Sequence, residues 1–392
     1  MIKIIHVINT LRMGGAETCV RLLVENLDRE RFLPLVLCTQ AGGPYEEELI
    51  AKGYVVKVLN RSRRSILLFP LFCWDVLITL YQMGVFLKRE RPDIVHTHLP
   101  ASAYFGIIAA RLAGISRVVH TFHSSTLFPV RSGRSLRTWL RVKLTRFLYR
   151  KVRAIVAVSR TIEEILKRVL PDRIGSIRVI PNSIEESRFQ LKDRESTLRR
   201  EMNVGPEDPL ISIIGTLNAV KNQALVLKAG ARLVSTFPGL HLLIVGEGPL
   251  KPELLALQQS LGLQRHCSFL GLRRDIPEIL AGTDIYVSTS RYEGMPLAIL
   301  EAMAAGKPIV ATAVPGNLEV LEEGAGLLVP QGDEAELERA LKELIENQPE
   351  RERLGKRAQE RFARLYSLES HIVQWQTLYE ELMEGESGCR SR

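Results

Sequence analysis

Short, nearly unbroken apolar runs alternate with stretches of helical periodicity along the whole chain, and the series restarts past its middle. Continuous apolar runs are typical of parallel strands covered on both faces, because strands with one wet face alternate apolar and polar residues. We therefore predict an α/β protein with two doubly wound parallel sheets in tandem. The predicted strands are IKIIHVIN, LPLVLCT, VVKVLN, DIVHTHL, RVVHTFH, AIVAVS and IRVIPNS, then LISIIGTL, LHLLIVGEG, CSFLG, DIYVSTS, KPIVAT and GLLVP.

The length of the chain fits this reading. At 392 residues it exceeds one ordinary core and suits two domains of roughly 150 to 200 residues. The charged stretch EESRFQLKDRESTLRREMNVGPEDP is the best linker candidate. We place the boundary near Glu185, which gives a first domain over 1–185 and a second over 186–367.

Composition excludes several classes of protein. An apolar content of 46% with 25% charged residues is globular. The five cysteines form no C-x-x-C pair, which argues against a zinc ribbon or a secreted disulfide framework. No small-residue cleavage site follows MIKIIHVIN, so we expect no signal peptide and take a reducing cytosol as the location.

Positive charge is concentrated in the first half. Residues 1–183 hold 29 Lys and Arg against 13 Asp and Glu, whereas the remainder holds 24 against 31. The segment from Arg131 to Arg153 carries nine basic residues, with apolar residues at helical spacing. Such a basic amphipathic helix suits anionic lipid or nucleic acid, although a helix packed on its own domain fits equally well. Its aromatic residues are too sparse for stacking single-stranded nucleic acid.

A second apolar segment, Ile66 to Leu87, approaches the length of a membrane span, about 20 residues. Asp75 lies in its middle, and a central Asp costs roughly 2.5 to 3.5 kcal/mol on insertion. We therefore prefer a buried or membrane-resting helix that leads into the DIVHTHL strand.

The stretch EGMPLAILEAMAAGKPIV places Glu293 and Glu301 around a predicted helix start. With Pro296 at the first helical position, the two carboxylates are roughly 12 Å apart along the axis. This matches the separation between the sugar and the ribose of a nucleotide sugar, with the diphosphate at the amides of Gly294 and Met295. A loop charge and an exposed helix residue are the alternative explanation.

Two further patterns are weak by themselves. Gly14 and Gly15 form a tight loop after the first strand, and its free amides suit a phosphate once Ala16 opens a helix. The sequence lacks G-x-G-x-x-G and a P-loop lysine motif. His96 and His98 share one face of a strand and could converge with a third ligand on a metal, as could the histidines of HTFH.

Many motifs occur together in one order along nearly the whole chain. They are GGAET, DIVHTH, TFHS, AVS, IPNSI, GTLNAVKNQALVLKA, LIVGEGP, FLGLRRDIPEIL, DIYVSTSRYEGMPLAILEAMAAGKPIVAT and AGLLVP. Together they resemble the family 4 retaining glycosyltransferases, which have the GT-B fold of two Rossmann-like domains facing a cleft. The E-x7-E helix is the most specific element of the resemblance.

The resemblance implies roles for residues of the second domain, which would bind the donor. Glu301 corresponds to the ribose-binding glutamate, and Glu293 to the acid that contacts the donor sugar, with the Gly294 and Met295 amides nearby. Lys221 corresponds to the lysine that neutralises the diphosphate.

Other roles fall on the first domain, which would bind the acceptor. Gly15 corresponds to the glycine loop that meets the phosphates or the acceptor, and His123 to a histidine near the anomeric carbon. A structural imidazole that satisfies a strand-end carbonyl is the alternative for His123. The helical pattern at 368–384 corresponds to the segment that packs back on the first domain.

Two positions depart from the family pattern. Thr216 stands where the family usually has an arginine, and Pro315 where it has a second glycine. The lost cation would weaken diphosphate binding unless another arginine replaces it. Our candidates are Arg273, Arg274 and Arg291.

No Asp-x-Asp pair exists in the sequence, so a metal-bound diphosphate is unsupported and we predict no metal ligands. Lys221 and helix-start amides would instead stabilise the leaving nucleoside diphosphate. The resemblance implies same-face attack through an oxocarbenium-like state, so no nucleophile is nominated. Domain closure would exclude water.

The sequence thus predicts a retaining, metal-independent glycosyltransferase with no cofactor besides its nucleotide-sugar donor, expected to be UDP-linked. The acceptor would be a glycan or lipid-linked molecule of cell-surface polysaccharide or glycolipid synthesis. We expect the basic first domain to rest on the anionic inner face of the plasma membrane and to bind no nucleic acid. The alternatives are a sugar-nucleotide epimerase and a non-catalytic nucleotide-sugar binding protein.

Overall fold

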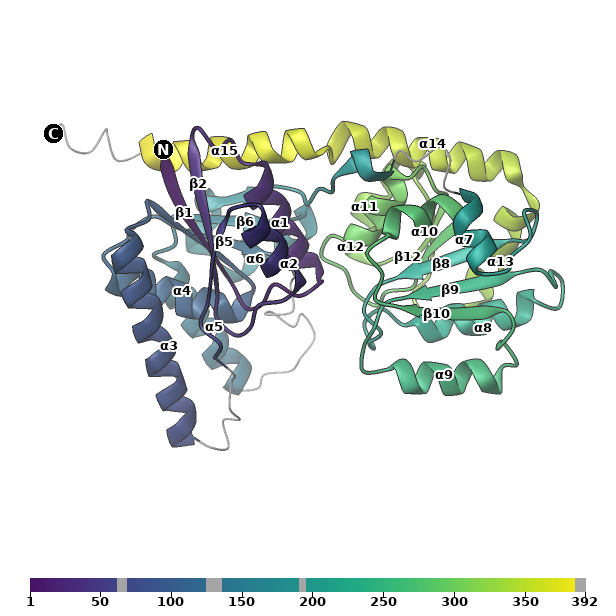
Figure 1. Ribbon diagram of the computed structural model, residues 1–392, viewed down its shortest axis with the longest axis horizontal. Coiled ribbons are helices and arrows are strands. Elements are labelled where there is room, and N and C mark those ends of the chain that lie inside the picture. Colours follow the sequence, from purple (N-terminus) through teal and green to yellow (C-terminus); the bar gives the residue numbers. More distant parts are fainter. Residues whose placement is uncertain (62–68, 125–135, 190–194, 385–392) are drawn as a thin grey trace. The chain divides into compact units, whose positions relative to one another are not determined.

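The computed structural model describes residues 1–61, 69–124, 136–189 and 195–384. The chain forms two compact units, one of Met1–Asn182 with Glu369–Arg392 and the other of Ser183–Leu368. Each is built around a parallel sheet (Figure 1).

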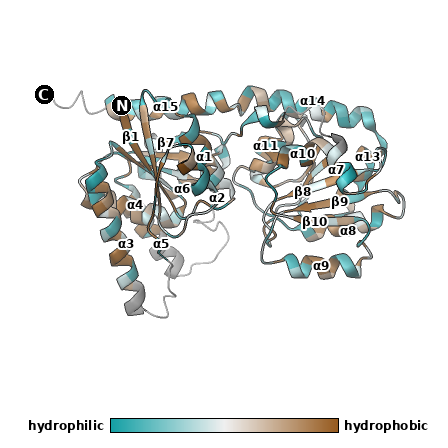
Figure 2. Ribbon diagram, viewed as in Figure 1, coloured by the Kyte–Doolittle hydropathy of each residue, from teal (hydrophilic) through white to brown (hydrophobic). Residues whose placement is uncertain are grey.

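The sheet of the first unit has the strand order β3-β2-β1-β4-β5-β6-β7. Its strands are largely buried. They are also largely apolar, as the colour of β1 shows in Figure 2. The order reverses between β1 and β4, so ligands of such a sheet gather where these two strands end. The strands are β1 (Ile2–Ile8), β2 (Phe32–Cys38), β3 (Val55–Val58), β4 (Ile94–His98), β5 (Val118–Phe122), β6 (Ala154–Ala157) and β7 (Ile177–Val179).

Helices cover the faces of this sheet, and α15 returns to it from the far end of the chain. The side chain of Arg117 donates to the carbonyl of Leu382, and His371 Nδ1 lies 2.6 Å from Pro181 O. The helical elements are α1 (Gly15–Asn26), α2 (Pro44–Ala51), α3 (Phe69–Glu90), α4 (Pro100–Leu112), α5 (Leu136–Tyr149), α6 (Arg160–Val169), η2 (Pro171–Ser176) and α15 (Leu368–Glu384).

The apolar segment after residue 65 forms α3, a helix as predicted, although residues 66–68 lie outside the described residues. Met83 and Leu87 are buried, while Tyr81 is 73% exposed on the opposite side. Among the described residues, no helix combines the length and the apolar character required to cross a bilayer.

The basic segment forms α5, also as predicted, and residues 131–135 lie outside the described residues. Tyr149 is buried against the rings of His120 and Phe122. Leu144 and Phe147, in contrast, are exposed. The helix therefore packs on its own unit and also presents apolar side chains outward.

The sheet of the second unit has the order β10-β9-β8-β11-β12-β13, and it reverses between β8 and β11. Every strand predicted for the two halves is present. An apolar core of this unit packs β8, β9 and β11 against α8 and α13. The strands are β8 (Leu210–Ile214), β9 (His241–Val245), β10 (Cys267–Gly271), β11 (Ile285–Ser288), β12 (Ile309–Thr312) and β13 (Leu327–Val329).

The helical elements of the second unit complete its two outer layers. They are η3 (Glu186–Phe189), α7 (Glu195–Glu201), α8 (Gln223–Leu233), α9 (Lys251–Ser260), α10 (Ile276–Gly282), α11 (Leu297–Ala304), α12 (Pro315–Val320), η4 (Glu322–Gly324), α13 (Glu334–Glu346) and α14 (Gln348–Leu365).

The stretch predicted to be a linker is instead part of the second unit, except for residues 190–194, which lie outside the described residues. Leu198 of α7 is buried with Leu210 and Ile279 in one apolar cluster. Arg199 donates to Asp284 Oδ2 at 2.5 Å. The prediction was wrong because the charged composition of this stretch conceals one buried helix face.

Candidate functional site

The loops after β8 and β11 pack on each other where the strand order of the second sheet reverses. Thr289 Oγ1 donates to the carbonyls of Lys221 and Asn222, each at 3.0 Å. The backbone N–H of Arg291 donates to Val220 O at 2.7 Å. These bonds hold the Lys221 loop against the loop that contains Glu293.

An ion pair forms between these two loops. Lys221 Nζ lies 2.5 Å from Glu293 Oε1, which also accepts a hydrogen bond from Ser290 Oγ at 2.6 Å. Glu293 is buried, whereas the Lys221 side chain is 26% exposed. An ammonium has three N–H donors. Lys221 can therefore bind an anion while its contact with Glu293 holds it in place.

Three glycines allow the loops around this ion pair to approach closely. A Cβ on Gly246 would lie 2.1 Å from Gly215 O, and one on Gly248 would lie 2.3 Å from Leu217 O. A Cβ on Gly316 would lie 2.7 Å from Glu293 O. Gly316 follows Pro315, the residue that replaces a family glycine. The close approach of the backbone to Glu293 therefore requires Gly316, and it does not require a glycine at position 315.

Helix α11 begins one residue later than predicted. Pro296 is its N-cap, with an extended ψ of 109°, and the first helical residue is Leu297. Proline at 296 supplies no N–H, so the first amide donors of the helix come from Leu297 and Ala298, while Gly294 and Met295 lie in the preceding loop. Glu301 lies in the second turn, as expected.

Glu301 is only partly exposed, and among the described residues its carboxylate makes no hydrogen bond or ion pair. Burial raises the pKa of Glu301 to about 7, and the positive charge of Arg188 opposes that rise. A carboxylate poorly solvated and without a fixed partner can accept hydrogen bonds from the hydroxyl groups of a ligand.

The structure narrows the choice of cation that could replace the family arginine. Thr216 is exposed and carries no charge. Arg273 is engaged by two carboxylates, with Nε 2.8 Å from Asp275 Oδ1 and Nη1 2.8 Å from Glu201 Oε1. Arg291 is exposed two residues before Glu293. Arg291 is thus better placed than Arg273, and Arg274 is exposed as well.

In the first unit, the glycine loop lies beside a carboxylate. Helix α1 begins at Gly15, one residue earlier than expected, with Gly14 as its extended N-cap. Glu17 accepts from Thr10 Oγ1 at 3.0 Å, and a Cβ on Gly14 would lie 2.5 Å from Glu17 Oε2. Burial raises the pKa of Glu17, and hydrogen bonds partly oppose this. A carboxylate here favours hydroxyl groups over phosphates near Gly15.

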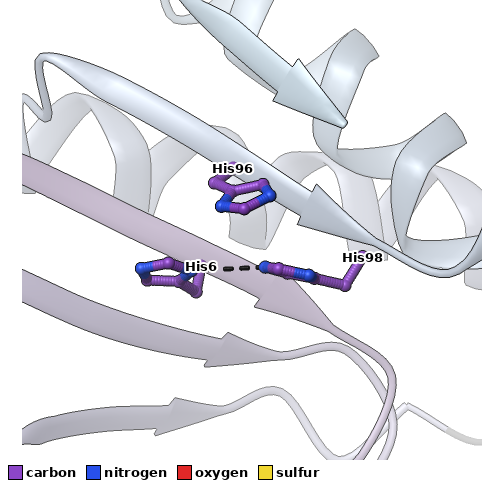
Figure 3. Close-up of side chains that lie close together, drawn as sticks. All are labelled: His6, His96 and His98. Carbon is purple, nitrogen blue, oxygen red and sulfur yellow. Dashed lines mark hydrogen bonds between the residues drawn. The ribbon is translucent and has the colours of Figure 1, made fainter. Parts of the chain in front are cut away.

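Buried histidines occupy the point where β1 and β4 of the first sheet lie side by side. His6 and His96 are paired across the two strands, and His98 ends β4 (Figure 3). His6 Nδ1 lies 3.2 Å from His98 Nε2. His98 Nδ1 in turn lies 3.3 Å from His123 Nε2. Among the described residues, His123 therefore contacts another imidazole and not the strand-end carbonyl suggested as its partner.

The same rings offer a possible metal site. One nitrogen from each of His6, His96 and His98 lies within 4.8 Å of the others. However, both nitrogens of His96 lie 2.7 Å from hydroxyl groups, those of Tyr379 and Thr121. The ring centroids of His96 and His98 also lie only 4.0 Å apart, with their planes tilted by 39°, whereas metal ligands point their ring edges at a common centre. The geometry favours hydrogen bonding over metal ligation.

Sequence reasoning missed several residues of these two sites. The only sequence signal for His6 was that it is a single polar residue inside an apolar strand. Ser290 and Thr289 lie in the STS motif that ends β11, and Gly316 lies next to a position already noted. Tyr379 gave no signal, because it lies 283 positions from its partner His96.

Two family descriptions match successive parts of the chain. Residues 13–188 match Glycosyltransferase Family 4, and residues 195–361 match Glycosyl transferases group 1. Together they cover most of both units.

Curated proteins similar to this chain include two bacterial enzymes. The UDP-Gal:alpha-D-GlcNAc-diphosphoundecaprenol alpha-1,3-galactosyltransferase of Escherichia coli is 29% identical over 347 residues, covering 85% of each chain. The N-acetyl-alpha-D-glucosaminyl L-malate synthase of Bacillus anthracis is 28% identical, covering 77% of this chain and 78% of its own.

Solved structures match nearly the whole chain. Anabaena HepE, in complex with UDP and glucose, superposes with a TM-score of 0.82 at 23% identity, over 97% of this chain and all of its own. Sucrose-phosphate synthase from Thermosynechococcus elongatus gives 0.81 at 21% identity, over 98% of this chain and all of its own. These likenesses establish the GT-B fold. With the family matches, they show that the chain belongs to the family 4, group 1 glycosyltransferases.

Proposed function

We propose that this glycosyltransferase transfers a sugar from a UDP-linked donor to a glycan or lipid-linked acceptor, with retention and without a metal or other cofactor. The Lys221–Glu293 ion pair at 2.5 Å, at the point where strand order reverses beside the start of α11, carries the proposal. Open α/β sheets bind their ligands at this point.

The donor would lie along the start of α11. Lys221 and the amides from Gly294 to Ala298 would stabilise the diphosphate, both when bound and as it leaves. Glu293 would contact the donor sugar, and Glu301 would accept hydrogen bonds from ribose hydroxyls. Arg291 would replace the cation lost at Thr216. The relatives' names support the donor class, since one uses UDP-galactose and HepE was solved with UDP.

The acceptor would be bound by the first unit. Gly15, with Glu17 beside it, favours hydroxyl groups, and His123 would lie near the anomeric carbon. The Escherichia coli relative acts on a diphosphoundecaprenol-linked sugar, which supports a lipid-linked acceptor.

A panel of UDP-, GDP-, ADP- and TDP-sugars with a polyprenyl-phosphate-linked acceptor tests this function. We expect release of UDP that depends on the acceptor, survives chelation of divalent metals, and is lost in Glu293→Gln. NMR of the product should show the anomeric configuration of the donor. Turnover of the donor without acceptor, and with no nucleoside diphosphate as final product, would point to the epimerase. Donor binding without any turnover would point to a binding protein.

We also propose that the first unit rests on an anionic membrane at the inner face of the plasma membrane. On α5, exposed Leu144 and Phe147 lie beside Lys143, Arg146 and Arg150 around a shallow hollow. Apolar side chains flanked by cations suit the headgroup region of a bilayer.

Helix α3 would contribute to the same membrane-binding surface. It is linked to α5 through α4, which packs against both helices. Bands of hydrophobic residues run along α3 (Figure 2). Its exposed apolar residues recur at helical spacing and include two aromatics that suit a membrane interface. They are Trp74, Leu77, Tyr81 and Val85.

Vesicle co-sedimentation tests the membrane proposal. We expect binding to phosphatidylglycerol vesicles and little binding to phosphatidylcholine, with the former reduced about tenfold in Phe147→Ser. The control is Leu272→Ser, which removes an exposed apolar residue of the second unit. Equal binding by the wild type and Phe147→Ser would contradict the proposal.

A further inference from the structure

Three imidazole rings of the first unit form one continuous hydrogen-bonded chain. His98 lies in the middle, with Nε2 3.2 Å from His6 Nδ1 and Nδ1 3.3 Å from His123 Nε2. Figure 3 shows the first of these links. The outer nitrogens, His6 Nε2 and His123 Nδ1, are buried and have no partner in the part of the chain that the structure describes. The three-ring chain therefore has two hydrogen-bonded links and one outer nitrogen at each end.

The rings are uncharged at neutral pH. Burial lowers the pKa of His6 to about 3 and that of His123 to about 4. Burial, followed by repulsion from neighbouring histidines, lowers the pKa of His98 well below its usual value. Each neutral ring carries one N–H. The three rings thus carry three N–H protons. Two of these protons lie in the two hydrogen bonds between rings, and the third must lie on an outer nitrogen at one end.

Two arrangements satisfy both links. In one, His6 donates to His98 and His98 donates to His123, so that His123 Nδ1 is an N–H donor. In the other, each ring holds its proton on its other nitrogen. His123 Nδ1 is then a bare acceptor, and His6 Nε2 carries the third proton. Changing His123 alone would set two N–H groups or two lone pairs against each other across the link to His98.

We propose that His6 and His98 are positioning residues that set, as one unit with His123, whether the outer nitrogen of His123 donates or accepts. The ligand group that Nδ1 would contact is a sugar hydroxyl, which accepts from an N–H at Nδ1 or donates to a bare Nδ1, so the tautomer sets the direction of that hydrogen bond. Only this choice of ligand rests on the proposed function, because the link between the rings is a property of the first unit alone.

His120 provides a matched control. It is buried like His6, one of its nitrogens bonds Thr97 Oγ1 at 2.9 Å, and the other has no partner among the described residues. It has no hydrogen bond to the three-ring chain among the described residues. A substitution at His120 therefore disturbs the same core without cutting the chain.

The test is ¹⁵N NMR of the full-length protein with labelled histidine. We expect one dominant His123 tautomer in the wild type and a shift in its tautomer ratio of about threefold or more in His6→Phe, two rings away. His6→Asn, whose amide can replace Nδ1, should restore the wild-type ratio, and His120→Phe should leave it unchanged. If His6→Phe and His98→Phe both fold and both leave the His123 ratio unchanged, the proposal is wrong.

Kinetics give the second readout. His6→Phe should lower kcat about tenfold with little change in the KM for the donor, and His6→Asn should restore most of it. Unchanged kcat in His6→Phe, with an altered tautomer ratio, would remove the sugar hydroxyl as the ligand. If tautomers are linked but no donor and acceptor pair gives turnover, the proposed function fails while the linkage stands.

Discussion

The two sheets share the strand order 3-2-1-4-5-6 around their reversal points, but they hold opposite kinds of polar group there. In the first unit, His6, His98 and His123 are neutral rings bonded to each other. In the second unit, Lys221 and Glu293 form an ion pair. The more basic half of the chain thus holds uncharged rings at its reversal point.

Strand order sets where polar groups gather in each unit, whereas burial sets their charge. Rings fully removed from water lose the proton that would make them cations. Lys221 keeps access to solvent, and a carboxylate lies within hydrogen-bond reach. The same edge of the same fold therefore suits a neutral ligand in one unit and an anion in the other.

Acid should destabilise the first unit and unfold it. Buried histidines have folded-state pKa values below the unfolded value near 6.5, so the unfolded state binds more protons below pH 6.5. Stability therefore falls as pH drops from about 6.5 toward 4, by up to about 1.4 kcal/mol per pH unit for each such histidine. Summed over six histidines, this loss exceeds the roughly 5 to 15 kcal/mol that typically stabilises a domain at about 25 °C. The histidines are His6, His96, His98, His120, His123 and His371.

Tryptophan fluorescence during urea unfolding measures this, because all three tryptophans belong to the first unit. His120→Gln should reduce the slope of stability against pH by about one histidine's share. A free energy of unfolding that is constant from pH 7 to 5 would contradict the charge state assigned to these rings.

Removing the cation of the second unit should affect catalysis next most strongly. In Lys221→Ala we expect kcat to fall about 10²- to 10³-fold, the range seen when one group that stabilises developing charge is lost. Nucleoside diphosphate release measures this. Lys228→Ala, which removes an exposed lysine of α8, is the control. A loss below about threefold in Lys221→Ala would place the diphosphate elsewhere.

Glu301 should give the second unit a pH dependence opposite to that of the first. Its folded-state pKa is raised to about 7, so its contribution to stability is complete below pH 4.5 and is lost as pH rises through 7. Glu301→Gln should therefore stabilise the second unit by about 1 to 3 kcal/mol at pH 8, and by little at pH 5. Hydrogen exchange of the β11 and β12 amides reports on this unit. A stability difference that does not change with pH would mean that Glu301 is well solvated.

The smallest effect concerns the hydroxyl group that holds His96. Tyr379→Phe removes the partner of His96 Nδ1 and should lower the stability of the first unit by about 1 kcal/mol. Tryptophan fluorescence again measures this. The control is Tyr81→Phe, at an exposed position of α3. Equal stabilities of the two variants would mean that His96 is held by packing alone.

The sequence predicts both sheets well because doubly buried strands are short continuous apolar runs bounded by turn residues, whereas the apolar run that forms α3 is much longer. The roles of Lys221 and Glu293 rest on the family resemblance and stay predictions, while the structure shows that the two side chains form an ion pair. The start of α11 was misplaced by one residue because proline fits both the N-cap and the first helical position.

Other features depend on contacts between distant residues. Leu198 looks like a lone apolar residue in a charged stretch until α10 covers it. The partners of His98 come from β1 and from the residue after β5, so no spacing in the sequence identifies them. Local pattern thus predicts elements and loop ends, while hydrogen-bonded networks require the folded chain.

Of the helices that the structure describes in the first unit, α15 is the last to be synthesised. It supplies Tyr379 to His96 and a carbonyl to Arg117, yet the entire second unit precedes it in the chain. Domains usually fold on the ribosome in the order in which they emerge. Here the second unit can finish while the first still lacks its closing helix. Until translation has delivered that helix, the nascent first unit keeps an uncovered flank of the kind that chaperones hold.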